Sequence, residues 1–200
     1  RNPHHTITPQ GLAGGGMVPG PGEISLAHHG VLFLDELAEF RRETLEILRQ
    51  PMEEHCVKLA RLAGNYEFPA DFMLVAAMNP CRCGYYPDLN RCHCTKGMVE
   101  QYLKKISQPL LDRIDICVET KRVEYQDLMK ENPHQETSAE IRKRVVTAME
   151  RQQQRFAGTN IRYNSRIPVA LLTKYCRLST KQKQYMESIY QKLELTARSY

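Results

Sequence analysis

The 200-residue sequence has no apolar stretch long enough to span a bilayer. Its longest uninterrupted apolar run is Phe72 to Met78, whereas a membrane helix needs roughly 20 such residues. It also has no basic, apolar and small-residue leader of the kind that directs secretion. These absences exclude a membrane span and lead us to expect a cytoplasmic protein with no membrane partner. Because the sequence opens at Arg1 without a methionine, we expect it to be an excised part of a longer protein.

The charge of the chain is unevenly distributed. The hydrophobic content of 42% and the charged content of 26% are those of an ordinary globular protein. Residues 1–120 contain 12 basic and 15 acidic residues, a net charge of −3. Residues 121–200 contain 16 basic and 8 acidic residues, a net charge of +8. We therefore expect two units, residues 1–120 and 121–200. The second could face DNA phosphates or simply be a solvated basic surface.

Three apolar runs predict strands of an α/β sheet. Val31–Leu34 has no polar alternation, which is typical of a strand buried on both faces of a parallel sheet. Phe72–Met78 and Ile114–Val118 are the second and third candidates. Helical stretches separate these runs, so the first unit is predicted to be an α/β layer.

The rest of the first unit is predicted to mix loops, a helix and a hairpin. Residues 1–30 are rich in Gly, Pro and His, which indicates loops with at most short helices. Leu37–Gln50 has the spacing of an amphipathic helix, which we expect to end at Pro51. Val57–Leu62 and Tyr66–Phe68 alternate in polarity and predict a hairpin.

The second unit is predicted to be a small basic helical bundle. Thr137 and Glu140 have the spacing of a capping box that opens a helix from about residue 138 to 156. Two further helices are expected, near Pro168–Cys176 and from Thr180 onward.

Polar side chains suited to nucleotide hydrolysis lie next to the predicted strands. Asp35 and Glu36 directly follow the first one, and the carboxyl end of a parallel strand faces the ligand crevice of an open sheet. Asp35 would hold Mg²⁺, usually through water, and Glu36 would polarise the attacking water. Asn79, after the second strand, could orient that water against a γ-phosphate. Arg113, beside the third, could reach the γ-phosphate of a neighbouring subunit.

Each of these patterns has a simpler explanation when it is taken alone. Apolar residues followed by Asp35 and Glu36 occur by chance at many strand ends. Asn79 before a proline also fits an Asx turn. Arg113 lies between acidic residues and fits a local ion pair worth about 0–1 kcal/mol. Their order along the chain favours a single nucleotide site.

Six blocks of the sequence resemble the magnesium-chelatase-related branch of the AAA+ ATPases. The resemblance covers essentially the whole chain, and a CxCGY…CxC insertion and the basic tail point to the bacterial competence-associated branch. It implies a partial AAA+ parallel-sheet core through about residue 120, followed by a small α-helical lid. The blocks are RNPHHT at 1–6, GGG at 14–16, PGEISLAH at 21–28, GVLFLDEL at 30–37, AAMNPC at 76–81 and LLDRID at 110–115.

The resemblance also implies a role for individual residues. Asp35 and Glu36 match the Walker B acids, and Asn79 matches sensor 1. Arg113 matches an arginine finger that acts in trans, and Arg198 looks like the sensor 2 arginine of the lid. ATP and Mg²⁺ are the implied cofactors.

The resemblance further implies partners and an activity. The hairpin at 57–68 and the insert at 1–29 match elements that line the central pore of hexameric relatives, where they can touch DNA. We therefore expect a homo-oligomeric ring, a hexamer, that binds branched or single-stranded DNA as an ATP-dependent branch-migration helicase in recombination. The alternative is the ATPase subunit of a chelatase that remodels a magnesium-inserting partner. A non-catalytic interaction fragment is the third reading.

One motif of the family is missing from the sequence. There is no G-x-x-x-x-G-K-[ST] and no Gly-Lys pair. Gly11–Gly22 is rich in glycine, but it lacks the lysine and hydroxyl that bind phosphate and Mg²⁺, and it follows no strand. We expect the P-loop to lie upstream of Arg1, so that this chain alone does not hydrolyse ATP.

Four of the seven cysteines are crowded into one short segment. Cys81-x-Cys83 and Cys92-x-Cys94 are eight residues apart, and four thiolates on two short arms can form a tetrahedral Zn²⁺ site. His93 is an alternative ligand, and reduced structural thiols or a disulfide stay open. Such a metal would brace the loop after the predicted sensor residue and take no part in chemistry, because four thiolates leave zinc no open position.

The other cysteines and the paired histidines are predicted to be structural. Cys56, Cys117 and Cys176 occur singly and are expected to be buried apolar fillers. His4-His5 and His28-His29 have no fixed metal-binding geometry. We expect them to be loop histidines with ordinary hydrogen bonds.

Overall fold

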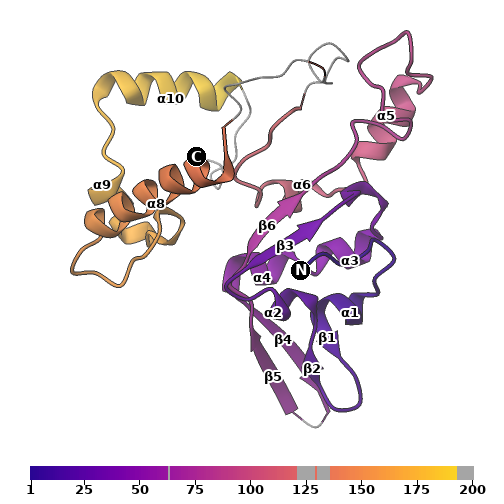
Figure 1. Ribbon diagram of the computed structural model, residues 1–200, viewed down its shortest axis with the longest axis horizontal. Helices are drawn as coiled ribbons and strands as arrows, with labels where there is room; N and C mark the ends of the chain where they lie inside the picture. Colours follow the sequence, from indigo (N-terminus) through magenta and orange to yellow (C-terminus); the bar gives the residue numbers. More distant parts are fainter. Residues whose placement is uncertain (63, 121–128, 130–135, 193–200) are drawn as a thin grey trace. The chain divides into compact units, whose positions relative to one another are not determined.

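The chain divides into two compact units, Arg1–Val118 and Glu119–Tyr200. The first is a mixed α/β unit, and the described part of the second is helical. Of the helices that the structure describes, none combines the length and the apolar composition needed to cross a bilayer. The structure is a computed structural model (Figure 1), which describes residues 1–62, 64–120, 129 and 136–192.

A parallel pair of strands, β3 (Val31–Leu34) and β6 (Met73–Ala76), confirms two of the predicted strands. The strands lie side by side along their whole length (Figure 1). Leu32 and Leu34 are fully buried, but Val31 is 44% exposed. The expectation that the first strand is buried on both faces is therefore wrong. Among the described strands β3 pairs with β6 alone, and only its Leu32 and Leu34 face packs on the core.

The start of the chain covers the other edge of β3. The nitrogen of Arg1 donates to the carbonyl of Val31 at 2.7 Å, and the amide of Phe33 donates to the carbonyl of Arg1 at 2.9 Å. The residues after Arg1 therefore run along β3 toward its carboxyl end.

Two β-hairpins extend from the first unit in the same direction (Figure 1). The longer one, β4 (Cys56–Arg61) and β5 (Gly64–Pro69), is antiparallel and confirms the predicted hairpin. The shorter one consists of β1 (Gly14–Gly15) and β2 (Gly20–Pro21). It lies between two short helices, as the glycine-rich composition predicts, namely α1 (Pro9–Ala13) and α2 (Glu23–Leu26).

The segment between β3 and β4 is not the single helix that the spacing predicts. It forms a 3₁₀ turn, η1 (Leu37–Glu39), and two short helices, α3 (Arg42–Glu46) and α4 (Arg49–Glu54). Phe40 ends η1 in an extended conformation and is buried. Pro51 does not end a helix, which corrects the prediction. It lies in the first turn of α4, where proline is tolerated because the N–H there has no intrahelical partner.

The apolar side chains of these elements meet in one core. From β3 it takes Leu32 and Leu34, so one face of that strand is anchored by packing. The fully or largely buried members are Leu12, Ala13, Ile24, Ala27, Leu32, Leu34, Leu37, Phe40, Leu45, Leu48, Val57, Ala70, Ile106 and Leu110.

The predicted third strand is absent. After the cysteine-rich segment come two helices, α5 (Lys96–Leu103) and α6 (Gln108–Leu111). Residues 114–118 are irregular, and Ile116 and Val118 are 79% and 77% exposed. A strand needs a hydrogen-bonded neighbour, and none of the described strands pairs with this segment.

The second unit begins with the predicted capping box. The Thr137 hydroxyl accepts a hydrogen bond from the Glu140 amide at 3.3 Å, and the Glu140 carboxylate accepts one from the Thr137 amide at 2.7 Å. These bonds satisfy two amides at the start of the helix and confirm the prediction. The helices are α8 (Ser138–Arg155), η2 (Asn164–Arg166), α9 (Val169–Tyr175) and α10 (Thr180–Lys192).

A small contact holds the end of α8 against α9. Phe156 is 2% exposed, and its ring meets that of Tyr175 edge to face, with the centroids 5.1 Å apart. The Arg155 guanidinium donates to the Asn164 side chain at 2.9 Å and also to the carbonyl of Tyr175. These contacts join the end of α8 to η2 and to the end of α9.

Candidate nucleotide site and cysteine cluster

Asp35 and Glu36 leave the sheet at the carboxyl end of β3. An Asp35 carboxylate oxygen accepts a hydrogen bond from the Glu36 amide at 2.9 Å. Glu36 has a left-handed backbone, with φ 51° and ψ 46°, which is uncommon for a residue other than glycine. Two backbone bonds hold the next residues against β6: Leu37 N–H to Ala77 at 2.9 Å, and Ala77 N–H to Leu34 at 3.0 Å. The chain therefore turns sharply here and exposes both carboxylates.

His5 contacts Glu36, which the sequence did not reveal. Its Nδ1 lies 3.0 Å from a Glu36 carboxylate oxygen, with side chains 29% and 55% exposed. The His5 ring stacks on His4, with centroids 4.1 Å apart, and meets Phe40 edge-on at 6.4 Å. His5 lies in a loop, as expected, and the side chain nearest its Nδ1 belongs to a predicted catalytic residue. The pairing of Arg1 with β3 is what brings it there.

Asn79 follows β6 at the same edge of the sheet. Because β3 and β6 are parallel and in register, their carboxyl ends lie together, so Asn79 and the two acids share one edge. The Asn79 side chain lies beside Gly84: a Cβ atom on that glycine would be 3.9 Å from its Cγ and Oδ1 atoms. The Asn79 side chain is thus next to the cysteine-rich loop.

Arg113 lies after α6 and does not precede a strand. Its guanidinium forms an ion pair with Glu53 of α4 and donates to the Pro109 carbonyl. The side chain is only 12% exposed. In this conformation Arg113 is engaged inside its own unit, and a role in a neighbouring subunit requires the pair with Glu53 to open. Arg198, the expected sensor 2 residue, lies outside the described residues.

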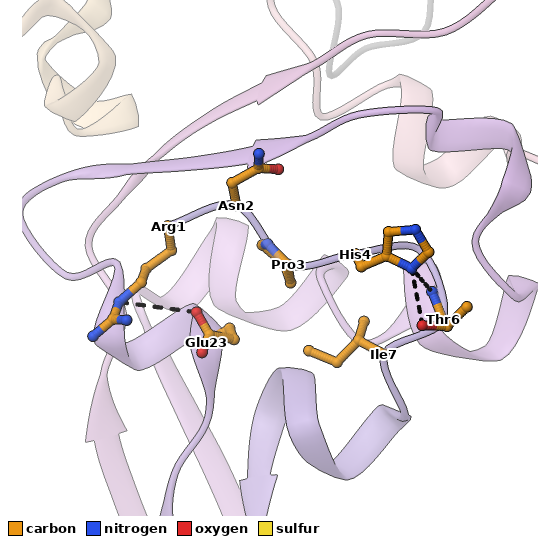
Figure 2. A pocket seen from close by; sticks show the side chains of 7 residues that line it. All are labelled: Arg1, Asn2, Pro3, His4, Thr6, Ile7 and Glu23. Atoms are coloured by element: carbon orange, nitrogen blue, oxygen red, sulfur yellow. Dashed lines mark hydrogen bonds and ion pairs between the residues drawn. The ribbon is translucent and has the colours of Figure 1, made fainter.

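A shallow pocket of about 360 Å³ lies beside the first residues of the chain (Figure 2). Arg1 and Glu23 face each other across it at 3.9 Å, and His4 hydrogen-bonds the Thr6 hydroxyl at 2.9 Å. Because the charged side chains lining it offset each other, we assign it no ligand. The lining residues are Arg1, Asn2, Pro3, His4, Thr6, Ile7 and Glu23.

The ends of the two hairpins border a groove of about 640 Å³. Met17, Val18 and Leu62 at these ends are 104%, 87% and 112% exposed. Fully exposed large apolar side chains at two adjacent hairpin ends are typical of a surface that meets a partner. The groove is lined by Gly16, Met17, Pro19, Ala60, Arg61, Leu62 and Tyr66.

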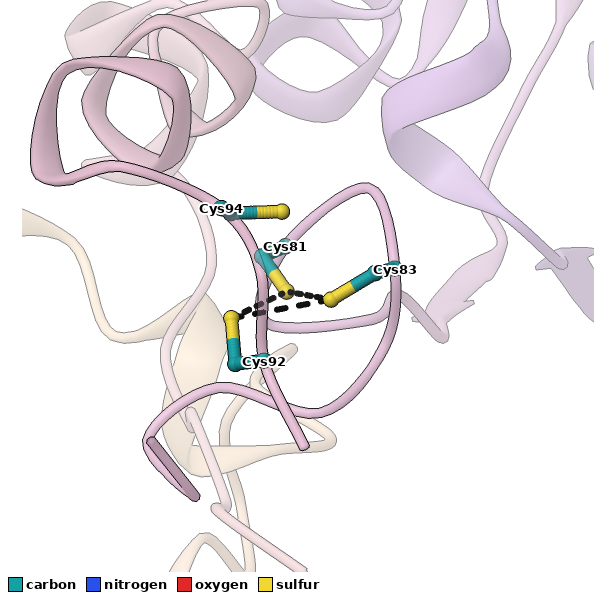
Figure 3. A group of neighbouring side chains, drawn as sticks. All are labelled: Cys81, Cys83, Cys92 and Cys94. Carbon is teal, nitrogen blue, oxygen red and sulfur yellow. Dashed lines mark hydrogen bonds between the residues drawn. The ribbon is translucent and has the colours of Figure 1, made fainter. Parts of the chain in front are cut away.

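The four clustered cysteines converge on one point (Figure 3). The Cys81 sulfur lies 3.4 Å from that of Cys83 and 3.8 Å from that of Cys92, and the sulfurs of Cys83 and Cys92 are 3.6 Å apart. All four ligand atoms lie within 4.8 Å of one another. Cys81 and Cys92 are buried with Val99 in a small apolar cluster of their own. The four thiols are free, so they form no disulfide with one another, and the group could hold a metal ion.

The neighbouring thiols strongly affect one another's ionisation. Burial opposes ionisation of Cys81, but the Tyr86 amide and the Cys83 and Cys92 groups that hydrogen-bond its sulfur lower its pKa to about 6. A backbone hydrogen bond from Cys94 lowers the pKa of Cys92. Burial and the sulfurs of Cys83 and Cys81 outweigh this effect and raise the pKa of Cys92 to about 12. Four thiols this close do not all ionise unless a cation compensates their charge.

Helix α5 lies between the cysteine cluster and the segment after β3. Its Val99 packs with Cys81 and Cys92, and just after its end the Lys105 ammonium is 3.4 Å from the Glu39 carboxylate and 5.3 Å from the centre of the Tyr102 ring. Burial raises the pKa of Tyr102 on α5, and Glu39, Cys81 and Glu36 raise that pKa further through their negative charge.

The remaining cysteines follow the sequence prediction only in part. Cys56 is buried, as expected, but Cys117 and Cys176 are exposed. Cys117 lies in the irregular segment that was predicted to be a strand, which explains its exposure. Cys176 follows the last residue of α9.

Two family models match nearly the whole chain. The family model described as magnesium chelatase, subunit ChlI, matches residues 1–128, and the model of the C-terminal part of that subunit matches residues 135–200. The chain belongs to the magnesium chelatase ChlI family. Its proteins are AAA+ ATPases. The mixed α/β unit with a parallel pair of strands, followed by helices, agrees with part of an AAA+-like domain and a helical C-terminal region.

The chain is also similar to individual bacterial proteins. It is 40% identical over its full 200 residues to the uncharacterized protein YifB of Salmonella typhimurium and to that of Escherichia coli. It is 39% identical over 200 residues to the competence protein ComM of Haemophilus influenzae. In each case the whole chain is covered, and it spans 38% of the relative's length.

Proposed function

We propose that this chain supplies the Walker B, sensor 1 and arginine-finger portion of an ATP-hydrolysing motor. The observation that carries the proposal is the edge of the sheet where Asp35, Glu36 and Asn79 come together. Three polar side chains with complementary roles follow two parallel strands at the place where open α/β sheets bind ligands. Membership in a family of AAA+ ATPases supports the same reading.

The residues present suit magnesium-bound ATP. One Asp35 oxygen is occupied by the Glu36 amide, which leaves the other for a magnesium-bound water. Bound Mg²⁺ supplies charge that offsets the developing negative charge of the phosphates. Glu36 accepts a proton from the attacking water, and Asn79 orients that water. The phosphate-binding loop is not in this sequence, so we expect the protein to provide it from another segment.

Arg113 is proposed to act across a subunit interface. Its pair with Glu53 keeps the guanidinium in place in the single chain, and assembly into a ring, expected to be a hexamer, would let it exchange Glu53 for a neighbour's γ-phosphate. Arg198 is proposed to contact nucleotide from the lid formed by residues 121–200.

DNA is the proposed substrate of the motor. The likeness to a competence protein, the net charge of +8 after residue 120 and the exposed hairpin ends support a branch-migration helicase. The alternative is an ATPase that remodels a protein partner, as the chelatase name of the family indicates. A helicase predicts DNA binding that weakens steeply with salt, because bound phosphates release counterions. A remodelling ATPase predicts no such binding.

We also propose that Cys81, Cys83, Cys92 and Cys94 bind Zn²⁺. Zn–S bonds of about 2.3 Å place tetrahedral sulfurs about 3.8 Å apart, close to the three distances of 3.4–3.8 Å in the cluster. A disulfide would need sulfurs only about 2.05 Å apart. Four thiolates give a closed, structural site.

Hydrolysis by the full-length protein tests the proposal. Glu36→Gln should abolish ATP turnover while nucleotide binding is retained, and Glu43→Gln on α3, an exposed carboxylate nearby, should leave turnover unchanged. Normal turnover by Glu36→Gln would reject the Walker B assignment.

A mixing experiment tests the arginine finger separately. Arg113→Ala and Glu36→Gln proteins should each be inactive, but mixed rings should recover turnover, because a Glu36→Gln subunit can supply Arg113 to its neighbour's intact carboxylate. Mixtures as inactive as their parents would place Arg113 in a purely internal role.

A further inference from the structure

The cysteine loop begins immediately beside a predicted catalytic side chain. Only Pro80 separates Asn79 from Cys81. The next three residues form a tight turn in which the Gly84 amide donates to the Cys81 carbonyl at 3.0 Å. Gly84 has a φ of +81°, and a Cβ atom added to it would meet the Asn79 carboxamide at 3.9 Å. The Asn79 side chain therefore lies beside the turn that the first two cysteines form.

The geometry of that turn depends on the sulfurs at its ends. Cys81 is fully buried, and its sulfur accepts the Tyr86 amide at 3.4 Å. Backbone amides also hydrogen-bond the other sulfurs, for example Tyr85 to Cys83 and Cys94 to Cys92. In metal sites, hydrogen bonds from residues that do not bind the metal orient the ligands, and these amides are placed to do so for the cysteine sulfurs. They connect the metal-binding group to the backbone on both arms of the loop.

The two arms of the loop bring their sulfurs within reach of one metal ion. The sulfurs of Cys81, Cys83 and Cys92 are 3.4–3.8 Å apart, and all four ligand atoms lie within 4.8 Å of one another. Zn²⁺ bound there would join the two arms, Cys81–Cys83 and Cys92–Cys94. Its loss would allow the arms to separate and release the turn under Asn79.

We propose that zinc bound by the four cysteines holds Asn79 in position, so that zinc occupancy controls the rate of ATP hydrolysis. The claim that the four cysteines bind zinc rests only on the distances between their sulfurs. The effect on hydrolysis rests on the proposed function, in which Asn79 orients the attacking water. Asn79 is then the catalytic group, and the cysteines are positioning residues that act through it.

Metal content tests the first part in the full-length protein. Reduced protein purified without added metal should contain about one zinc per chain by elemental mass spectrometry. Cys83→Ser, at an exposed ligand, and Cys92→Ser, at a buried one, should both lose it. Cys117→Ser and Cys176→Ser, at exposed cysteines outside the cluster, should keep it. Metal-free wild-type protein, or full zinc in both ligand variants, would overturn the proposal.

A double-mutant comparison tests the coupling to Asn79. A misplaced catalytic group can cost about 100-fold in rate, and we expect a loss of kcat of up to about that size in Cys83→Ser, with KM for ATP unchanged. Asn79→Ala should show a similar loss, and Asn79→Ala combined with Cys83→Ser should be no slower than Asn79→Ala alone. Multiplied losses, or normal turnover by zinc-free Cys83→Ser, would refute the coupling.

The two proposals fail in different ways. If Asn79→Ala and Glu36→Gln both hydrolyse ATP normally, the proposed function fails while the zinc count still decides the metal site. If those variants are inactive but zinc-free protein is fully active, only the link between zinc and Asn79 is rejected. Circular dichroism of each variant shows whether the fold is intact.

Discussion

The contact between His5 and Glu36 makes a quantitative prediction about turnover. Glu36 is 55% exposed, so little besides His5 restricts its side chain. The His5 Nδ1 lies 3.0 Å from one carboxylate oxygen, within hydrogen-bonding distance, and this contact leaves the other oxygen for the attacking water. His5→Ala removes this restraint, and His5→Asn should keep it, because the asparagine Nδ2 can donate from nearly the same place.

The size of the effect follows from the exposure of the pair. A partly solvated hydrogen bond contributes about 1 kcal/mol, which at about 1.4 kcal/mol per tenfold corresponds to about a fivefold change in rate. Steady-state hydrolysis by the full-length protein should show kcat about fivefold lower in His5→Ala, with KM for ATP unchanged, and largely restored in His5→Asn. Unchanged kcat in His5→Ala, or equal losses in both variants, would refute the positioning role.

Three further predictions concern stability. Leu34→Ala should lower the free energy of unfolding by about 2–5 kcal/mol, because it opens a cavity in the core. Val31 lies in the same strand but is 44% exposed, so Val31→Ala should lower it far less. Urea denaturation of the two variants measures the difference. Thr137→Ala should lower the free energy of unfolding by about 1 kcal/mol, because the N-cap hydrogen bond is lost. Thr147→Ala within the same helix should leave that free energy nearly unchanged, and equal losses in the two variants would contradict the capping role. The Ser107 hydroxyl and Arg49 lower the pKa of Glu46 from 4.5, so its stabilisation is present above the unfolded pKa and is lost as pH falls through the folded one. Melting temperatures below about pH 4.5 should therefore fall more steeply in wild type than in Glu46→Gln.

Local patterns predicted the local elements of this fold. The alternation in Val57–Leu62 and the capping box at Thr137 each depend on neighbours a few residues away, and both were confirmed. The helix predicted for Leu37–Gln50 failed because burial of Phe40 in the core, a tertiary effect, interrupts the helical spacing. Ile114–Val118 has the composition of a strand, but composition cannot supply the partner strand that hydrogen bonding requires.

The candidate site was predictable where its residues adjoin strands. Asp35, Glu36 and Asn79 were placed from the ends of two apolar runs, and the cysteine group from its spacing. The partners of these residues were not. His5 reaches Glu36 only because Arg1 pairs with β3, and Arg113 meets Glu53 from 60 residues away. The place of His5 in the block RNPHHT at 1–6, which resembles the family, was the one available signal for the first contact.

ATP turnover by the full-length protein, with and without a four-way DNA junction, decides most directly whether this chain belongs to a DNA motor. We predict turnover that the junction stimulates, that falls with salt as DNA binding weakens, and that Glu36→Gln abolishes. Turnover that is indifferent to the junction at low salt would contradict the DNA motor and favour an ATPase that remodels a protein partner.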